Sequence, residues 1–179
     1  EKLDKSMKLD GSEPIYGSPS ALYTVVEFAD FQCPHCAQAT PDVKRVVSQY
    51  KGIVKLMYKH YPLSNACNPN ITGAFHENAC IAAYAADCAQ EQGKFWDMAN
   101  LIFKNQEFLS ARDLDFIAQQ IKLNMEEYQS CMKKEEIKQG IQSDIEAADS
   151  IGVEGTPALF LHDGEVWWKV LDQAQGLEA

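Results

Sequence analysis

Two cysteines separated by two residues form the motif with the clearest chemistry in this sequence, Cys33-Pro34-His35-Cys36. The motif follows an apolar run that ends at Phe31 and precedes a segment with helical spacing, so we expect it at a strand-to-helix junction. A thiol at a helix N-terminus has a lowered pKa, because unpaired N–H groups and the helix dipole stabilise an anion there. We therefore predict a redox pair with Cys33 as the nucleophile and Cys36 as the resolving thiol.

The two residues between the cysteines suit this chemistry. Pro34 fits the first helical turn because the N–H that it lacks would have no partner there. His35 can provide a positive charge or a hydrogen bond to the thiolate. We therefore include both in the predicted catalytic motif.

A structural zinc site and an inert disulfide are the alternatives for this motif. His35 and the two cysteines would be part of a zinc site, but no second CxxC or HxxxH follows at finger-like spacing. A CxxC bridge at a helix start is usually strained and reducible rather than stabilising. We therefore predict a redox function with no metal and no cofactor.

Glu27 is the acid at the centre of the apolar run before the motif. A carboxylate in a buried strand is costly unless it has a function, and at this position Glu27 is placed to relay a proton for Cys36. Alternatively, Glu27 faces a solvated edge, because the direction of its side chain cannot be read from the period alone. The residues by themselves leave both interpretations open.

Length and composition are those of an ordinary globular protein. The 179 residues suffice for one domain with an inserted subdomain, and 46% of them are hydrophobic and 23% charged. The net charge of −10 argues against nucleic acid or an anionic membrane as the main partner. The sequence has no run of the ~20 apolar residues needed to cross a bilayer. Because the chain begins at Glu1 and not at a methionine, we expect that a leader, anchor or domain precedes it.

Four further cysteines are too widely spaced for a simple metal motif: Cys67, Cys80, Cys88 and Cys131. They fit two structural disulfides, which indicates an oxidising compartment. Cys80 and Cys88 lie about 12 Å apart along a predicted helix and cannot pair with each other. We favour Cys67–Cys80 with Cys88–Cys131, because each bond then joins neighbouring segments. The pairing of Cys67 with Cys88 and of Cys80 with Cys131 remains the alternative.

Two strand regions enclose a long helical region. Residues 21–31 and 53–61 are predicted strands joined by a helix. Pro41 should kink this helix or make it restart. Residues 73–150 are predicted to be mainly helical, with a break near Lys133. Thr156-Pro157 then opens a strand, where a cis bond is the typical reason for a proline at this place. Asp163-Gly164 indicates a hairpin after it.

Together these features resemble the DsbA-type thioredoxin-fold proteins over nearly the whole chain. The Cys33–Cys36 motif is one that this family favours, Thr156-Pro157 matches its cis-proline loop, and Glu27 lies where the family tends to keep a buried acid. The resemblance implies an α/β thioredoxin fold with a helical insertion. Its parts would be a lead-in at 1–20, a thioredoxin-like domain at 21–63 and 152–179, and an inserted helical subdomain at 64–151.

The segment 62–89 is also similar to DsbA-like domains that are partnered with or fused to vitamin K epoxide reductase homologues. The DsbA family usually ends in a full helix packed on the sheet, whereas only residues 172–179 remain for it here.

The resemblance implies a thiol–disulfide oxidoreductase, most simply an oxidase that donates the Cys33–Cys36 disulfide to unfolded exported proteins. Thr156 and Pro157 would bind the substrate as an added strand. The implied reoxidant is a quinone-linked membrane protein, either DsbB-like or like vitamin K epoxide reductase. A monomer in the periplasm or another extracytoplasmic space, tethered to the membrane in the full-length protein, is implied as well.

A disulfide reductase or isomerase is the alternative within the same chemistry, because such proteins also carry a threonine before the cis-proline. The alternative from another class is a peptide-binding or chaperone module that keeps the fold without turnover. The intact pair of motifs favours the enzyme.

Overall fold

The computed structural model describes residues 1–73 and 75–172, which form two compact units. Of the described residues, unit 1 comprises 1–29, 35–61 and 144–172, and unit 2 comprises 30–34, 62–73 and 75–143. The boundaries expected for the insert were 64 and 151. They differ from those of unit 2 chiefly because the last helix of the insert continues into unit 1.

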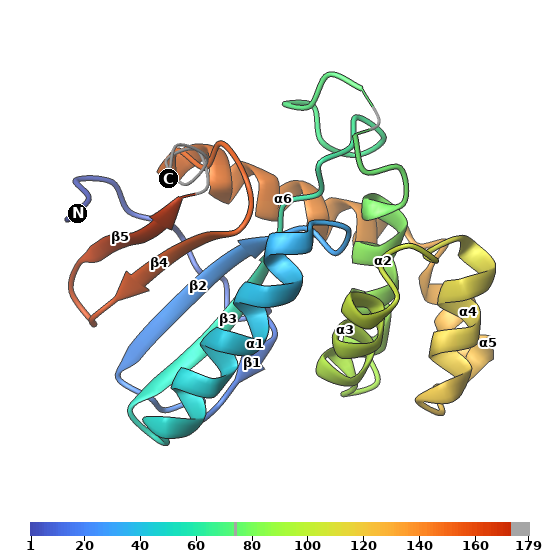
Figure 1. The fold of residues 1–179 in the computed structure, drawn as a ribbon, viewed down its shortest axis with the longest axis horizontal. Helices are drawn as coiled ribbons and strands as arrows, with labels where there is room; N and C mark the ends of the chain where they lie inside the picture. Colours follow the sequence, from blue (N-terminus) through green and yellow to red (C-terminus); the bar gives the residue numbers. More distant parts are fainter. Residues whose placement is uncertain (74, 173–179) are drawn as a thin grey trace. The chain divides into compact units, whose positions relative to one another are not determined.

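Unit 1 contains a five-stranded mixed sheet in the order β1-β3-β2-β4-β5 (Figure 1). Only β2 and β3 pair in parallel among the strands of the described residues, and their neighbours pair antiparallel. The helix α1 connects this parallel pair as a βαβ crossover. The strands are Ile15–Tyr16 (β1), Tyr23–Ala29 (β2), Val54–His60 (β3), Ala158–His162 (β4) and Trp167–Asp172 (β5).

Helix α1 (Pro34–Gln49) runs through Pro41 as one element. The restart expected at Pro41 is therefore wrong. A proline in a helix interior removes one backbone hydrogen bond, and the buried residues Cys36, Thr40 and Val47 hold the helix against its neighbours on both sides of that gap.

The N-terminal lead-in is attached to both edges of the sheet. Its β1 pairs with β3 at one edge. At the other edge, Leu3 donates its N–H to Trp167 O at 2.9 Å, and Lys169 donates its N–H to Glu1 O at 2.7 Å. Pairing of this kind occupies backbone groups that would otherwise be open for association with another chain.

Lys59 on β3 forms a buried ion-pair cluster in unit 1. Its ammonium lies 3.1 Å from Glu13 and 2.9 Å from Asp144, and 3% of its side chain is exposed. Burial lowers the pKa of Lys59, but the two carboxylates outweigh this effect and raise it. Asp144 also accepts the N–H of His60 at 2.8 Å. The cluster thus joins the lead-in, β3 and the last helix.

An apolar groove lies on the α1 side of the sheet. It has a volume of about 600 Å³ and includes the exposed side chains of Val46, Tyr50, Ile53 and Val170. The C-terminal segment in which this chain departs from the family pattern follows Asp172 and lies outside the described residues.

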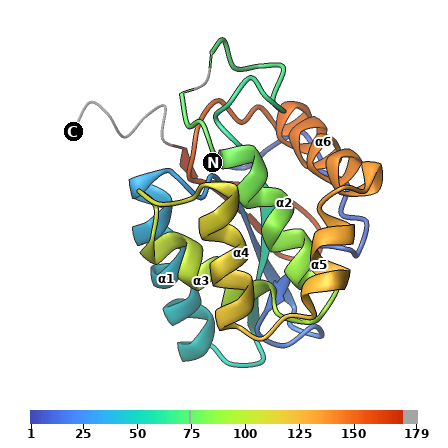
Figure 2. The same cartoon turned by 90° about the vertical axis from the view of Figure 1, so that its right-hand side faces the viewer.

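Unit 2 is helical, and α2 lies at its centre (Figure 2). The buried alanines of α2, including Ala82, Ala85 and Ala86, allow α3, α4 and α5 to approach its backbone closely. The helices are α2 (Ala79–Gln90), α3 (Phe95–Lys104), α4 (Ala111–Gln120), α5 (Met125–Cys131) and α6 (Glu135–Ile151), the last shared with unit 1.

Two disulfides fasten α2. Cys67–Cys80 connects the preceding loop to its first turn, and Cys88–Cys131 connects its last turn to the end of α5. This is the pairing that we favoured from the sequence. The expected break near Lys133 is also present, between α5 and α6.

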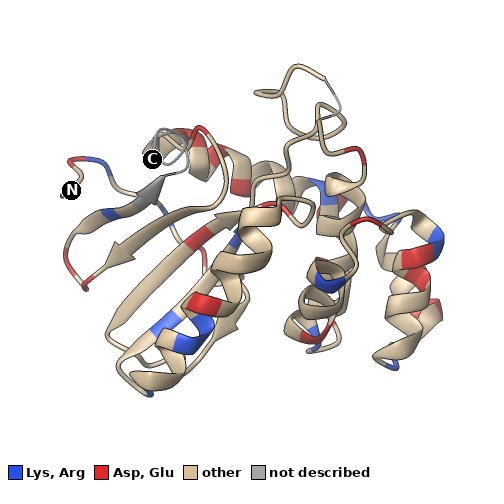
Figure 3. Ribbon diagram, in the orientation of Figure 1, with Lys and Arg blue, Asp and Glu red and all other residues tan. Residues whose placement is uncertain are grey.

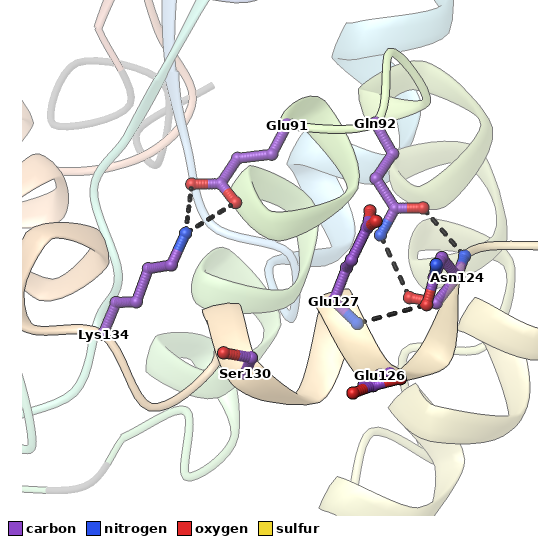
Figure 4. A pocket seen from close by; sticks show the side chains of 7 residues that line it. All are labelled: Glu91, Gln92, Asn124, Glu126, Glu127, Ser130 and Lys134. Carbon is purple, nitrogen blue, oxygen red and sulfur yellow. Dashed lines mark hydrogen bonds and ion pairs between the residues drawn. The ribbon is translucent and has the colours of Figure 1, made fainter.

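A polar hollow near the C-terminal end of α2 is crossed by side-chain interactions (Figure 4). Lys134 lies 3.1 Å from Glu91. Gln92 accepts the N–H of Asn124 at 2.8 Å and donates to Asn124 O at 3.1 Å. These contacts join α2 to the starts of α5 and α6, which gives the hollow a structural explanation.

The Lys59 cluster leads to a prediction for stability. Replacing Lys59 with methionine should lower the free energy of unfolding by about 3 to 5 kcal/mol, because Glu13 and Asp144 then stay buried without their cation. Urea unfolding measures this change. Lys138→Met is the matched control, because Lys138 forms an exposed pair with Glu135 that should contribute less than about 1 kcal/mol. Equal losses in the two variants would contradict the prediction.

Candidate redox site

The cysteine motif lies at the N-terminal end of α1, as expected. Helix α1 begins at Pro34, so Cys33 directly precedes it and Cys36 lies in its first turn. Cys33 is 4% exposed and Cys36 is fully buried. The first turn of α1 has no acidic side chain (Figure 3). Nothing in that turn therefore opposes the helix dipole, which favours a thiolate at Cys33.

Pro34 and His35 are both exposed on that turn. Pro34 is the first residue of α1, where its missing N–H costs no helical hydrogen bond. The assignment of His35 to the site remains a proposal from the motif.

Asp30 organises the loop between β2 and Cys33. Its carboxylate is completely buried and accepts the N–H of Gln32 at 2.6 Å and that of Leu63 at 2.7 Å. Its backbone carbonyl accepts the N–H of Cys33 at 3.1 Å. Asp30 thus fixes the turn that delivers Cys33 to the start of α1.

Two glutamine side chains, one of them in the loop itself, connect this loop with the rest of unit 2. Gln106 donates its side-chain amide to Phe31 O at 2.7 Å and to Cys33 O at 2.9 Å. Gln32 accepts the N–H of Asn78 at 2.7 Å, directly before α2. The backbone around Cys33 is therefore anchored by groups that are far away in the sequence.

His76 is a further titratable group of this region. Its Nδ1 lies 2.9 Å from Asp30 Oδ2, and 16% of the His76 side chain is exposed. The hydrogen bond to Asp30 raises the pKa of His76 above its usual value, and partial burial offsets this in part. The charges of Asp30 and Cys33 raise it further. His76 thus carries a positive charge over a wider pH range than a free histidine.

No motif in the sequence marks Asp30, His76 or Gln106 as site residues. The one local signal was Asp30, a second acid at the end of the apolar strand and three residues before Cys33. His76 and Gln106 lie 43 and 73 residues after Cys33, and no spacing rule connects them with the motif.

Glu27 lies in the central strand β2 and is fully buried. The interpretation of Glu27 as a residue on a solvated edge is therefore wrong. Its carboxylate accepts a hydrogen bond from Thr40 Oγ1 at 2.8 Å. Thr40 lies four residues after Cys36 in α1, so the two share one face of the helix.

Thr156 and Pro157 precede β4 directly, and the bond between them is cis. Both residues are buried. Pro157 thus lies just outside the paired strand, as a residue without an N–H must. The role of this pair in substrate binding remains a prediction.

A comparison with protein families identifies the chain. A family model described as "Thioredoxin" matches residues 9–176. The chain belongs to this thioredoxin family. The predicted fold class, an α/β thioredoxin fold with a helical insertion like that of DsbA, is confirmed.

Solved thioredoxin-fold structures resemble this one over most of its length. A thioredoxin-like oxidoreductase from Silicibacter pomeroyi is 27% identical, with a TM-score of 0.74 over 94% of this chain and 90% of that protein. DsbA2 from Pseudomonas aeruginosa is 29% identical, with a TM-score of 0.71 over 98% of this chain and 94% of that one. BdbD from Bacillus subtilis, at 20% identity and a TM-score of 0.76, shares the fold.

The curated relatives are longer proteins. The Na(+)/H(+) antiporter NhaA 3 of Salinispora tropica is 34% identical over 148 residues, which are 83% of this chain and 21% of the antiporter. The chain thus spans about a fifth of the length of such relatives. In the described part of this thioredoxin-family chain, no helix has the length and apolar character to span a membrane. A cluster of three or more metal-ligating side chains is likewise absent from the described residues.

The raised pKa of His76 predicts a pH-dependent contribution to stability. Because folding raises this pKa, the Asp30–His76 pair stabilises the fold fully below the unfolded value of about 6.5, and the contribution disappears as pH rises through the folded value. His76→Gln should therefore lower the free energy of unfolding by about 1 to 3 kcal/mol in mildly acidic buffer and by much less in alkaline buffer. Urea unfolding of the oxidised protein at several pH values tests this. A loss that does not depend on pH would refute it.

Proposed function

We propose that this thioredoxin-family chain is a thiol–disulfide oxidoreductase that oxidises pairs of thiols in unfolded exported proteins. The placement of Cys33 carries the proposal, because a buried thiol directly before a helix, held by Asp30 and Gln106, suits a stabilised thiolate. The likeness to DsbA2 of Pseudomonas aeruginosa, at 29% identity, supports the same chemistry.

The reaction proceeds by two thiol–disulfide exchanges. A substrate thiolate attacks Cys33 Sγ in the oxidised enzyme, the Cys33–Cys36 bond breaks, and Cys36 leaves as a thiolate. A second substrate thiolate then attacks the substrate sulfur of the mixed disulfide, and Cys33 leaves as a thiolate. The substrate loses two electrons and two protons and gains a disulfide, while the enzyme disulfide is reduced to two thiols.

Reoxidation requires an external electron acceptor. By family resemblance we propose a quinone-linked membrane protein that accepts the two electrons from Cys33 and Cys36. Two structural disulfides fit an oxidising, extracytoplasmic compartment. The antiporter relatives, in which the similar segment is about a fifth of the protein, support tethering to a membrane. The association with vitamin K epoxide reductase homologues remains a prediction, as does the monomeric state.

Thr156 and Pro157 are proposed to bind the substrate backbone. Peptide groups beside a strand end can accept an extended chain as an added strand, which gives affinity without a strict sequence preference. The position of both residues directly before β4 supports this role.

Direction of electron flow distinguishes the oxidase from its alternatives. In the reduced protein we expect the pKa of the Cys33 thiol to lie well below the ~8.5 of a free cysteine. The ultraviolet absorbance of the thiolate, followed against pH, measures this pKa. The Cys33–Cys36 disulfide should then oxidise reduced glutathione and a reduced dithiol peptide. Cys33→Ser is the control, because it leaves Cys36 as the reduced thiol.

A pKa of Cys33 close to that of a free thiol would contradict the proposed mechanism. A protein that unscrambles mispaired disulfides faster than it forms new ones would instead be an isomerase. A protein that binds unfolded chains without exchanging disulfides would be the peptide-binding module.

Glu27 is proposed to relay a proton for Cys36. Its burial and its hydrogen bond to Thr40, on the helix face that carries Cys36, support this role. Glu27→Gln should slow reduction of the enzyme disulfide by a dithiol on the order of 100-fold and change its pH profile. Thr40→Val is the control, because it removes the hydrogen bond and keeps the carboxylate. A pH profile of Glu27→Gln that matches that of the unchanged protein would exclude the relay.

A further inference from the structure

We propose that His76, held in its charged form by the buried carboxylate of Asp30, stabilises the Cys33 thiolate and thereby makes the Cys33–Cys36 disulfide more oxidising. This inference rests on the proposed function and adds a positioning pair outside the CxxC motif. The pair comes from the loop before α2 and the turn before Cys33, both in unit 2.

Three nitrogens surround the buried carboxylate of Asp30. Its two oxygens face three nitrogens, namely the N–H groups of Gln32 and Leu63 and the Nδ1 of His76, at 2.6 to 2.9 Å. With the side chain fully buried, the negative charge requires a cation beside it, and His76 is the cationic group in contact with it.

This contact also fixes which nitrogen of His76 binds Asp30. Nδ1 must donate to the carboxylate, because a carboxylate oxygen can only accept. A second proton on Nε2 then completes the imidazolium and has its charge offset by Asp30. The side chain is anchored from its backbone as well, since His76 donates its N–H to Leu63 O at 2.9 Å.

Cys33 and His76 both contact Asp30, because the Asp30 carbonyl accepts the N–H of Cys33 at 3.1 Å while its carboxylate lies 2.9 Å from His76 Nδ1. The Cys33 thiolate is one of the two charges that raise the pKa of His76, the other being Asp30. An interaction between two titrating groups is reciprocal, so a thiolate that favours the imidazolium is favoured by it to the same extent. Asp30 itself is negative and disfavours the thiolate. The positive charge of His76 therefore offsets, at Cys33, the negative charge of the carboxylate that positions its loop.

The interaction between the His76 imidazolium and the Cys33 thiolate is present in only one redox state of the enzyme. The disulfide of the oxidised enzyme has no charge at Cys33, so the imidazolium stabilises the reduced enzyme selectively. Stabilising the reduced form makes the disulfide a stronger oxidant. The effect should fade as pH rises through the pKa of His76.

A titration of the unmodified protein tests the inference without any substitution. The His76 ring signals, followed by NMR against pH in the reduced and the oxidised protein, report its proton affinity in both states. We expect about a tenfold higher affinity in the reduced protein, because only that state has the Cys33 thiolate. The same affinity in both states would overturn the inference.

Variants provide the second test. His76→Gln keeps an amide donor for Asp30 but no charge, and it should lower the ionisation constant of Cys33 about tenfold. Its equilibrium constant with glutathione at neutral pH should shift by a similar factor towards a weaker oxidant. His76→Lys should recover part of both changes. Glu77→Gln, one residue further on and exposed, is the matched control and should change neither.

The outcomes separate this inference from the proposed function. If the unmodified protein oxidises dithiol peptides and His76→Gln has an unchanged Cys33 titration, the function stands and the inference fails. If the unmodified protein exchanges no disulfides, the function fails, whereas the NMR comparison of the two redox states still decides the interaction between His76 and Cys33. Urea unfolding of each variant shows whether it is folded before these measurements.

Discussion

The buried carboxylate of Asp30 is the interaction on which the redox site depends. It accepts hydrogen bonds from the backbone N–H of Gln32, in the loop after β2, and from that of Leu63, in the segment after β3. It also contacts His76. A carboxylate without these partners would be costly to bury. The residues that satisfy Asp30 therefore also determine the path of the chain into Cys33.

The helical insertion has a direct part in this site. The segment from Leu63 to Gln106 provides the backbone and side-chain groups that hold residues 30–33. Its centre is α2, which the two disulfides fasten at both ends. A rigid α2 keeps the loop before it in place, and this loop contains His76. The structural disulfides thus support the redox pair without taking part in its chemistry.

The other buried charges of the chain follow the same principle in unit 1. Lys59 is neutralised by Glu13 and Asp144, and Glu27 accepts a hydrogen bond from Thr40. A buried ion-pair cluster such as that of Lys59 stabilises the fold little relative to apolar packing. Removing one of its members, however, leaves a buried charge without a partner. The Lys59 cluster joins segments that are distant in the sequence, so it also specifies which segments meet.

The sequence by itself determined the CxxC pair at a helix start, the cis-proline strand and the α/β class, because these depend on local spacing and on residues with restricted backbones. Tertiary structure decided the rest. It placed Glu27 inside the sheet, since period alone does not show which face of a strand is covered. It also joined Asp30 to His76, because hydrogen bonds between residues 46 positions apart arise from chain topology, which no local pattern encodes.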